Sequence, residues 1–187
     1  AWFTDQGARF GDTILAANMI LMQFVTFAAF FLDGFALAAE SLVGQAVGAN
    51  DRKLSKRIIR TTFELGVVTA LLLSLLLAVS YNIILVLLTS NQEVINTAQA
   101  YASWIIIAPV ASVAAYLLDG IFIGAALTRQ MRSAMIVSLA IFLFACWGLV
   151  VPYANHGLWA SLMIYYLSRA ASLAFYLPKV STGQVQS

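Results

Sequence analysis

The chain has 187 residues, of which 62% are hydrophobic and only 10% are charged, and its mean hydropathy is +0.90. Soluble globular domains carry about 25% charged residues, so this composition excludes an ordinary soluble domain and indicates a membrane protein. The net charge of +2 is too small to indicate a nucleic-acid partner, and the single Cys146 excludes an internal disulfide or a cysteine metal cluster.

The first residues, AWFTDQGARFGD, lack the charged and apolar regions of a signal peptide. They also lack an initiator methionine. We therefore expect the chain to begin within a longer protein.

Five apolar segments are long enough to cross a bilayer, which takes about 20 helical residues. The sequence therefore predicts an all-α integral membrane protein with about five transmembrane helices. The first three segments exceed the thickness of the hydrocarbon core, so we expect them to tilt or to extend beyond it. The predicted spans are residues 13–47, 55–88, 96–127, 132–151 and 157–177.

Lysine and arginine gather after the first span, after the third span and at the C-terminal end, where Arg169 is counted together with Lys179. The connections TSNQE and PYANHG, after the second and fourth spans, contain neither residue. Nine of the ten basic residues then lie on one side of the membrane, with Arg9 as the exception. Because basic connections tend to stay in the cytoplasm, we predict a cytoplasmic C-terminus and an outside N-terminus.

Two carboxylates, Asp33 and Glu40, interrupt the first span. They lie seven residues apart and so share one helix face, which Met19 and Thr26 continue. A charge at the bilayer centre costs about 2.5 to 3.5 kcal/mol, so we expect this face to point into a protein interior. Asp33 is predicted to line a wet central cavity, whereas Glu40 is predicted to lie at the cytoplasmic rim. The basic residues available to pair with Glu40 there are Arg52, Lys53 and Arg60.

Two further polar residues, Asn18 and Gln23, lie in the outer half of the first span. Either they contact a solute in a central cavity, or they form hydrogen bonds to a neighbouring helix. The sequence leaves both alternatives open.

The third span contains a second LDG triplet, which repeats the one at Asp33. We expect Asp119 either to be a proton or cation site that lines a pathway or to form a structural hydrogen bond with a neighbouring helix. Tyr116 precedes Asp119 by about one turn, so it is placed to share the hydrogen bonds of this carboxylate.

Small residues and a proline mark expected packing positions. Gly44 and Gly48 form one GxxxG pattern and Gly120 and Gly124 form a second, and both patterns are typical of close helix packing. Pro109 lies within the third span, where it either serves a functional kink or only improves packing.

Nothing in the sequence indicates bond-making chemistry. The lone His156 lies in a short outer connection, where a metal or catalytic role is not expected. The chain contains no Ser/His/Asp set, phosphate-binding loop or HExxH motif. We therefore expect no enzyme activity, no resident cofactor and no metal site.

Several runs resemble one family of transporters. AVGANDRKLSK, LLDGIFIGAALTRQMR, ILAANMILMQF and TRQMRSAM are similar to motifs of the multidrug and toxic compound extrusion (MATE) family, DinF-type branch. They occur in the expected order, with the expected helix lengths between them. The resemblance implies twelve helices in two lobes, so residues 1–187 would be most of the C-terminal lobe, helices eight to twelve, without the N-terminal lobe.

This resemblance also implies a function. Such proteins are antiporters of the bacterial inner membrane that export amphipathic or cationic drugs and toxic compounds by alternating access, in exchange for protons or sodium. The implied partners are a small-molecule substrate, the bilayer and the N-terminal lobe. In one branch a carboxylate on the tenth helix helps bind the coupling cation, and Asp119 falls near that position. In DinF-type members the coupling aspartates are mainly attributed to the first lobe.

Two other functions are weighed against export. A lipid-linked oligosaccharide flippase of the same superfamily would need an arginine-rich cavity, whereas only Arg169, near the end of the last span, lies in an apolar core. A non-transporting scaffold subunit would bind a partner through its glycine faces and would tolerate the loss of Asp33 and Asp119.

Overall fold

A computed structural model describes residues 2–182, which fold almost entirely into helices. The predicted all-α fold is therefore confirmed. A short helix at the N-terminus precedes four helices that are each long and apolar enough to cross a membrane. The helices are α1 (Trp2–Ala8), α2 (Asp12–Gly48), α3 (Arg52–Leu88), α4 (Gln92–Gly124) and α5 (Thr128–Thr182).

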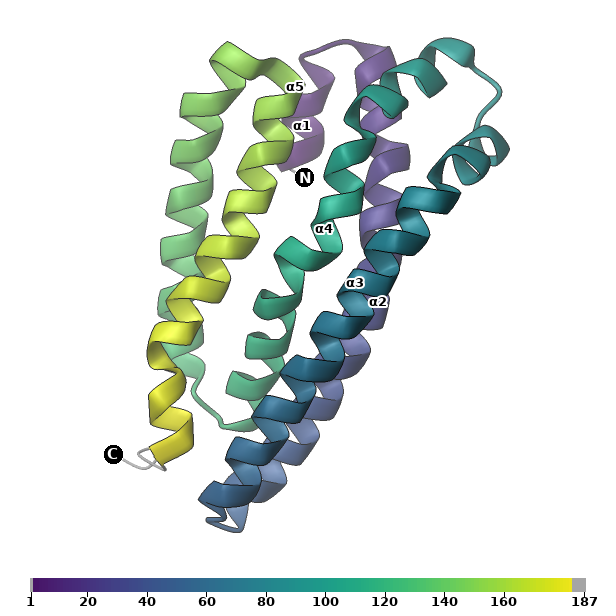
Figure 1. Ribbon diagram of the computed structural model, residues 1–187. Helices are drawn as coiled ribbons and strands as arrows, with labels where there is room; N and C mark the ends of the chain where they lie inside the picture. Colours follow the sequence, from purple (N-terminus) through teal and green to yellow (C-terminus); the bar gives the residue numbers. More distant parts are fainter. Residues whose placement is uncertain (1, 183–187) are drawn as a thin grey trace.

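The last helix, α5, is bent into a hairpin of two limbs. The backbone leaves the helical conformation at Ala154, where φ is 47° and ψ is −126°, just after Pro152. Gly157 allows the limbs to meet there, because a Cβ at this position would collide with the carbonyl oxygen of Leu149. Figure 1 shows the two limbs side by side, with the bend at the same end of the molecule as the turn between α3 and α4. These limbs occupy the residues of the fourth and fifth predicted spans.

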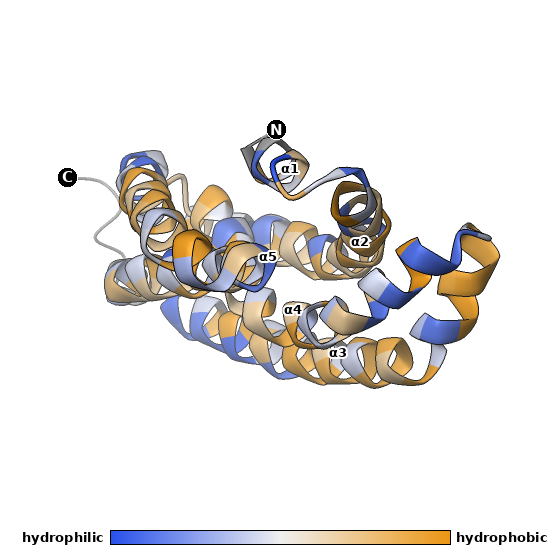
Figure 2. Cartoon of the chain, turned by 90° about the horizontal axis from the view of Figure 1, so that it is seen from above, coloured by the Kyte–Doolittle hydropathy of each residue, from blue (hydrophilic) through white to orange (hydrophobic). Residues whose placement is uncertain are grey.

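The central helix of the bundle is α4, which contacts α2, α3 and α5. Viewed along the bundle, α4 lies between these helices (Figure 2). Of its most apolar 18-residue window 67% is buried, against 17% for α3. The site described below is therefore built around α4.

Glycines form the close contact between α2 and α4. A Cβ at Gly120 would collide with the carbonyl oxygen of Ala36, and one at Gly124 would collide with a carbonyl oxygen about one turn further along α2. Gly44 of α2 also lies against Gly124, since an added Cβ would come within 3.3 Å of the Gly124 carbonyl oxygen. A Cβ at Gly48 would meet nothing within 4 Å, so only one glycine of the first GxxxG pattern packs closely.

The helices α2 and α4 end in the same kind of turn. After α4, the N–H groups of Ala126 and Leu127 donate to carbonyls three and five residues earlier, and Ala126 has a φ of 57°. Asn50 and Asp51 repeat this pattern after α2, where Asn50 has a φ of 53°. Both turns are Schellman motifs, which reverse the chain within a few residues. Asp51 then caps α3 by accepting a hydrogen bond from the N–H of Leu54.

The two LDG triplets do not occupy equivalent places. Gly34 lies in the middle of α2, and an added Cβ there would meet nothing within 4 Å. Gly120 lies near the end of α4, in contact with the backbone of α2. The repeat is therefore a local match in sequence without a shared structural role.

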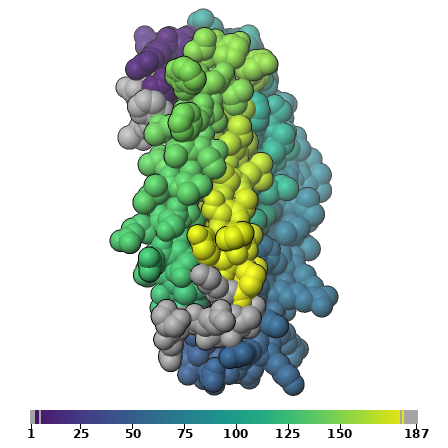
Figure 3. Space-filling view, turned by 90° about the vertical axis from the view of Figure 1, so that its left-hand side faces the viewer, coloured from purple at the N-terminus to yellow at the C-terminus, as the bar shows by residue number. Residues whose placement is uncertain are grey.

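The outward faces of α3 and α5 are apolar. Val79 and Leu87 on α3 and Phe144 and Trp147 on α5 are each more than 70% exposed. The space-filling view in Figure 3 shows the face formed by the two limbs of α5. Since apolar surface of this extent is stable only in contact with lipid or protein, the chain is a multi-pass membrane protein.

Candidate functional site: carboxylates and tyrosines around α4

Two hollows meet at one stretch of α4. The first lies between α2 and α4, has a volume of about 300 Å³ and is lined by Asp33, Glu40, Tyr116 and Asp119 among its residues. The close glycine contact holds α2 and α4 together directly beside it, because Gly120 also lines this hollow.

The second hollow lies between α4 and the second limb of α5 and has a volume of about 240 Å³. Tyr116 and Asp119 line this hollow too, so their side chains form the wall that the two hollows share. The ring centres of Tyr116 and Tyr166 lie 6.1 Å apart across it. We refer to the polar side chains of both hollows as the polar cluster. Its members are Asp33, Glu40, Tyr116, Asp119, Tyr165, Tyr166 and Arg169.

An ion pair between Asp119 and Arg169 lies at the centre of the polar cluster. The Nε of Arg169 donates to Oδ2 of Asp119 at 2.9 Å, and its Nη2 donates to Oδ1 at 2.8 Å. The side chain of Arg169 is 12% exposed and that of Asp119 is 27% exposed. A bidentate pair of this kind stabilises two charges that would each be costly if they were left alone in a membrane interior.

The position of Arg169 corrects the sequence analysis, which counted this residue with the basic cytoplasmic end. Its removal from that group leaves eight of the ten basic residues on the predicted cytoplasmic side. The sequence contained a signal for the difference: Tyr165, Tyr166 and Arg169 share one helix face by their spacing, within an apolar run. That signal does not reveal the partner, which comes from another helix.

Glu40 also differs from its expected surroundings. Of the basic residues proposed as its partners, Arg60 instead binds Glu64 at 2.7 Å, and no ion pair joins Glu40 to a basic residue within the described chain. Glu40 lines the same hollow as Asp33 and Asp119. The structure therefore groups Glu40 with the two aspartates and not with the basic rim.

The face of α2 that carries Asp33 is open. Met19 is 56% exposed, and Thr26 and Asp33 are exposed as well, so residues 2–182 do not bury the polar face that was expected to point into a protein interior. The hydroxyl of Thr26 donates to the carbonyl of Met22 within its own helix.

Asn18 belongs to a buried network and does not line either hollow of the polar cluster. Its amide exchanges two hydrogen bonds with the amide of Asn155, at 2.7 and 3.0 Å. The indole N–H of Trp159 donates to Oδ1 of Asn18 at 2.9 Å. This geometry agrees with the helix-to-helix alternative for Asn18, and it joins α2 to the bend of α5. Sequence reasoning did not single out Asn155 or Trp159 as partners.

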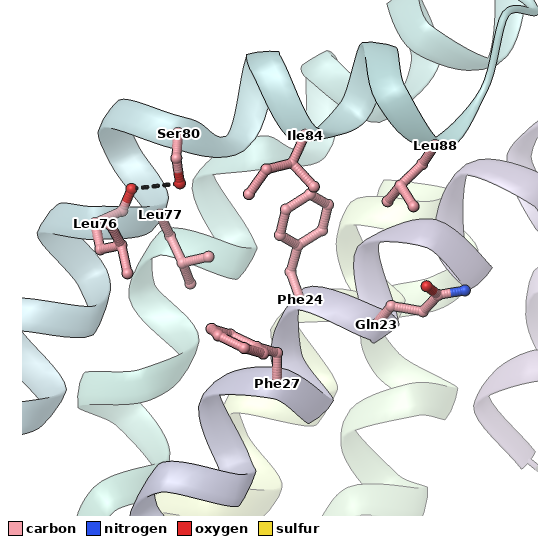
Figure 4. A pocket seen from close by; sticks show the side chains of 8 residues that line it. All are labelled: Gln23, Phe24, Phe27, Leu76, Leu77, Ser80, Ile84 and Leu88. Carbon is pink, nitrogen blue, oxygen red and sulfur yellow. Dashed lines mark hydrogen bonds between the residues drawn. The ribbon is translucent and has the colours of Figure 1, made fainter.

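Gln23 lies apart from the polar cluster as well. Figure 4 shows it at the edge of an apolar groove of about 470 Å³ between α2 and α3. The other residues that line this groove are Phe24, Phe27, Leu76, Leu77, Ser80, Ile84 and Leu88. The structure therefore brings Gln23 together with apolar side chains, and not with Asp33 or Asp119.

The remaining marked residues lie outside the hollows. Pro109 is buried within α4, and its carbonyl accepts a hydrogen bond of 3.4 Å from the hydroxyl of Ser112. His156 lies at the bend of α5, where its Nδ1 accepts a hydrogen bond of 3.0 Å from Trp104 and its ring lies 4.6 Å from that of Tyr101 at a tilt of 56°. In residues 2–182, no three His, Cys, Asp or Glu side chains are grouped so that they hold a metal ion.

Comparison with known proteins identifies the family. Residues 7–148 match the sequence pattern of the family described as MatE. The chain belongs to the MatE family. The resemblance drawn from the sequence motifs is therefore confirmed. Members of this family are transporters and not enzymes, as the sequence predicted.

Individual relatives agree with this assignment. The chain is 40% identical over 172 residues to DNA damage-inducible protein F of Escherichia coli K12, covering 91% of the chain and 37% of that protein. It is 25% identical over 179 residues to Protein DETOXIFICATION 42 of Arabidopsis thaliana, covering 94% of the chain and 34% of that protein. The chain therefore spans less than two fifths of the length of these relatives.

A solved structure shows the same fold. The crystal structure of the eukaryotic MATE transporter AtDTX14 superimposes with a TM-score of 0.79 at 13% sequence identity. The match covers 90% of this chain and 39% of the transporter. The helices described above therefore have the arrangement of part of a MATE transporter.

Proposed function

We propose that this chain forms most of the second lobe of a MATE antiporter that exports amphipathic or cationic compounds across the bacterial inner membrane. Export takes place by alternating access, in exchange for protons or sodium, and needs no resident cofactor. The observation that carries the proposal is the polar cluster. It combines three carboxylates with one guanidinium, so its net charge is −2 when all four groups are ionised.

The composition of the polar cluster suits an organic cation or a proton. Asp33 and Glu40 have no ion-pair partner among the described residues, so their charge is available to a solute. Tyr116 in the same hollow, and Tyr165 and Tyr166 in the adjoining one, offer aromatic faces, which attract cations through their ring quadrupoles. If protons and a cationic solute occupy the carboxylates in turn, the entry of protons is coupled to the export of the solute.

The open face of α2 fits a missing lobe. Phe30 and Leu37 are 71% and 65% exposed beside the exposed Asp33. An aspartate against lipid costs about 2.5 to 3.5 kcal/mol, so a protein surface or a wet cavity must cover this face in the membrane. The first lobe of the full-length protein is the occupant that the proposal assigns to it.

The rival functions fit the polar cluster less well. A flippase for an anionic lipid-linked sugar requires uncompensated positive charge, but Arg169 is bound by Asp119 and the cluster is acidic overall. A scaffold subunit requires no unpaired carboxylates in a hollow. Export is therefore the function that the geometry supports best.

The test uses the full-length protein in bacterial cells that lack other efflux pumps. We expect its expression to lower the accumulation of a fluorescent cationic dye, and Asp33→Asn to reduce the efflux rate at least about tenfold, because a neutral amide cannot exchange a proton for a cation. Immunoblotting checks that each variant reaches the membrane.

Glu93→Gln is the matched control, because Glu93 is an exposed acid at the start of α4 and lies outside both hollows. It should export the dye as the wild type does. Unchanged accumulation with wild-type protein in the membrane, or full efflux by Asp33→Asn, contradicts the proposed function.

A further inference from the structure

Asp119 is less exposed than Asp33, yet both of its oxygens already have a cation bound. Arg169 contacts Oδ1 and Oδ2 at 2.8 and 2.9 Å through two different nitrogens. The guanidinium is held by the fold itself, on the second limb of α5, and it stays protonated in proteins. Asp119 therefore differs from Asp33 and Glu40, which line the same hollow without such a partner.

We propose that Arg169 is a built-in counter-ion that occupies the place of an inorganic cation at Asp119 and so determines which cations this lobe accepts. The inference rests on the proposed export function and deepens it. Sodium does not bind Asp119 while the pair is intact, whereas Asp33 and Glu40 have no ion-pair partner among the described residues.

The geometry gives the reason. A sodium ion needs several oxygen ligands around it, but the two oxygens of Asp119 face guanidinium N–H groups. Any cation that approached this carboxylate would also lie close to a positive charge, in a setting where little solvent screens the repulsion. The enclosure of the pair, with Arg169 only 12% exposed, strengthens this exclusion.

Arg169 supplies the positive charge among the side chains that line the two hollows. The titratable side chains that line the two hollows with it are Asp33 and Glu40 of α2, Tyr116 and Asp119 of α4, and Tyr165 and Tyr166 of α5. Among these lining residues Arg169 is the one cation. Without it, the carboxylate of Asp119 and the hydroxyls of the neighbouring tyrosines would lie in the hollow with no cation beside them, and oxygen is the ligand atom that small hard cations prefer.

The test measures the thermal stability of purified full-length protein in sodium chloride and in choline chloride at equal ionic strength. Arg169→Met removes the charge and keeps an extended side chain. We expect this variant to gain a sodium-specific rise in Tm of about 2–4 °C beyond any response of the wild type, because a bound ion stabilises the folded state. The double variant Asp119→Asn with Arg169→Met should lose the added response.

Two further variants sharpen the result. Arg169→Lys keeps a positive charge at Asp119 and should gain no sodium response. Arg132→Met removes an exposed arginine from the first limb of α5, far along the chain from the pair, and should also behave as the wild type does.

If Arg169→Met does not fold, the wild type is compared with the double variant, in which neither position 119 nor position 169 carries a charge. Equal sodium responses of these two proteins support the proposal. A wild-type response that the double variant loses shows that Asp119 already binds sodium, and it overturns the proposal, as does a folded Arg169→Met without a new response. Tm does not depend on transport, so failure of dye export tests the proposed function separately.

Discussion

Two polar side chains within apolar helices, Asn18 and Asp119, form hydrogen bonds to side chains of another helix. Asn18 has an exposure of 2%, and its carbonyl and amide groups are bonded to Asn155 and Trp159. Asp119 is similarly defined by Arg169. In both cases a polar side chain in an apolar segment forms hydrogen bonds to a side chain of another helix.

Asn18→Leu should lower the free energy of unfolding of the full-length protein by about 1–2 kcal/mol, because the buried side chains of Asn155 and Trp159 lose their partner. Chemical denaturation followed by tryptophan fluorescence measures this change. Asn96→Leu is the control, since Asn96 bonds only to the exposed Gln92 within its own helix. Equal effects of the two substitutions would show that the buried network contributes nothing special.

At the scale of helices, the contact between α2 and α4 positions the site. Gly120 lines the hollow between α2 and α4 and also touches the backbone of α2. The same residue therefore sets the separation of the two helices and the shape of the hollow. A helix pair without a hydrophobic driving force in lipid depends on such close backbone approach. The GxxxG pattern at Gly120 predicted this contact, whereas the same pattern at Gly44 and Gly48 engages only Gly44.

Gly120→Ala should destabilise the full-length protein by about 2 kcal/mol or more, because the added methyl group would overlap a carbonyl of α2 and force the helices apart. Gly48→Ala adds the same group where nothing lies within 4 Å, so we expect a change within about 0.5 kcal/mol. Thermal unfolding in detergent gives both values. A destabilisation by Gly48→Ala as large as that by Gly120→Ala would refute the packing described here.

At the scale of the whole molecule, the bundle has one strongly basic end. Arg52, Lys53, Lys56 and Arg57 follow the turn after α2, and that turn lies at the same end as the turn between α4 and α5 (Figure 1). The turn between α3 and α4 and the bend of α5 lie at the opposite end. The distribution of basic residues predicts that the first of these ends is cytoplasmic.

Cysteine labelling in intact cells tests this orientation. In full-length protein without native cysteines, Gln92→Cys should react with a membrane-impermeant maleimide, because α4 begins at the predicted outer end. Lys53→Cys should react only after the cells are permeabilised. The reverse pattern of labelling would contradict the predicted topology.

The sequence by itself determined the membrane class, the helical fold and the family. These depend on local properties, namely the length of apolar runs, the spacing of polar residues and short motifs, each of which is contained in one segment. The sequence also marked Asp33, Glu40, Tyr116 and Asp119, because charged and polar groups are conspicuous in apolar helices.

Only the tertiary structure decided which of these residues act together. The pairing of Asp119 with Arg169, the network around Asn18 and the place of Glu40 beside the aspartates all join helices that are distant in sequence. Such contacts depend on how each helix is rotated and shifted against its neighbours, and packing across the whole bundle fixes that arrangement. A pattern within one helix shows that a buried charge needs a partner, but only the assembled bundle shows which partner it has.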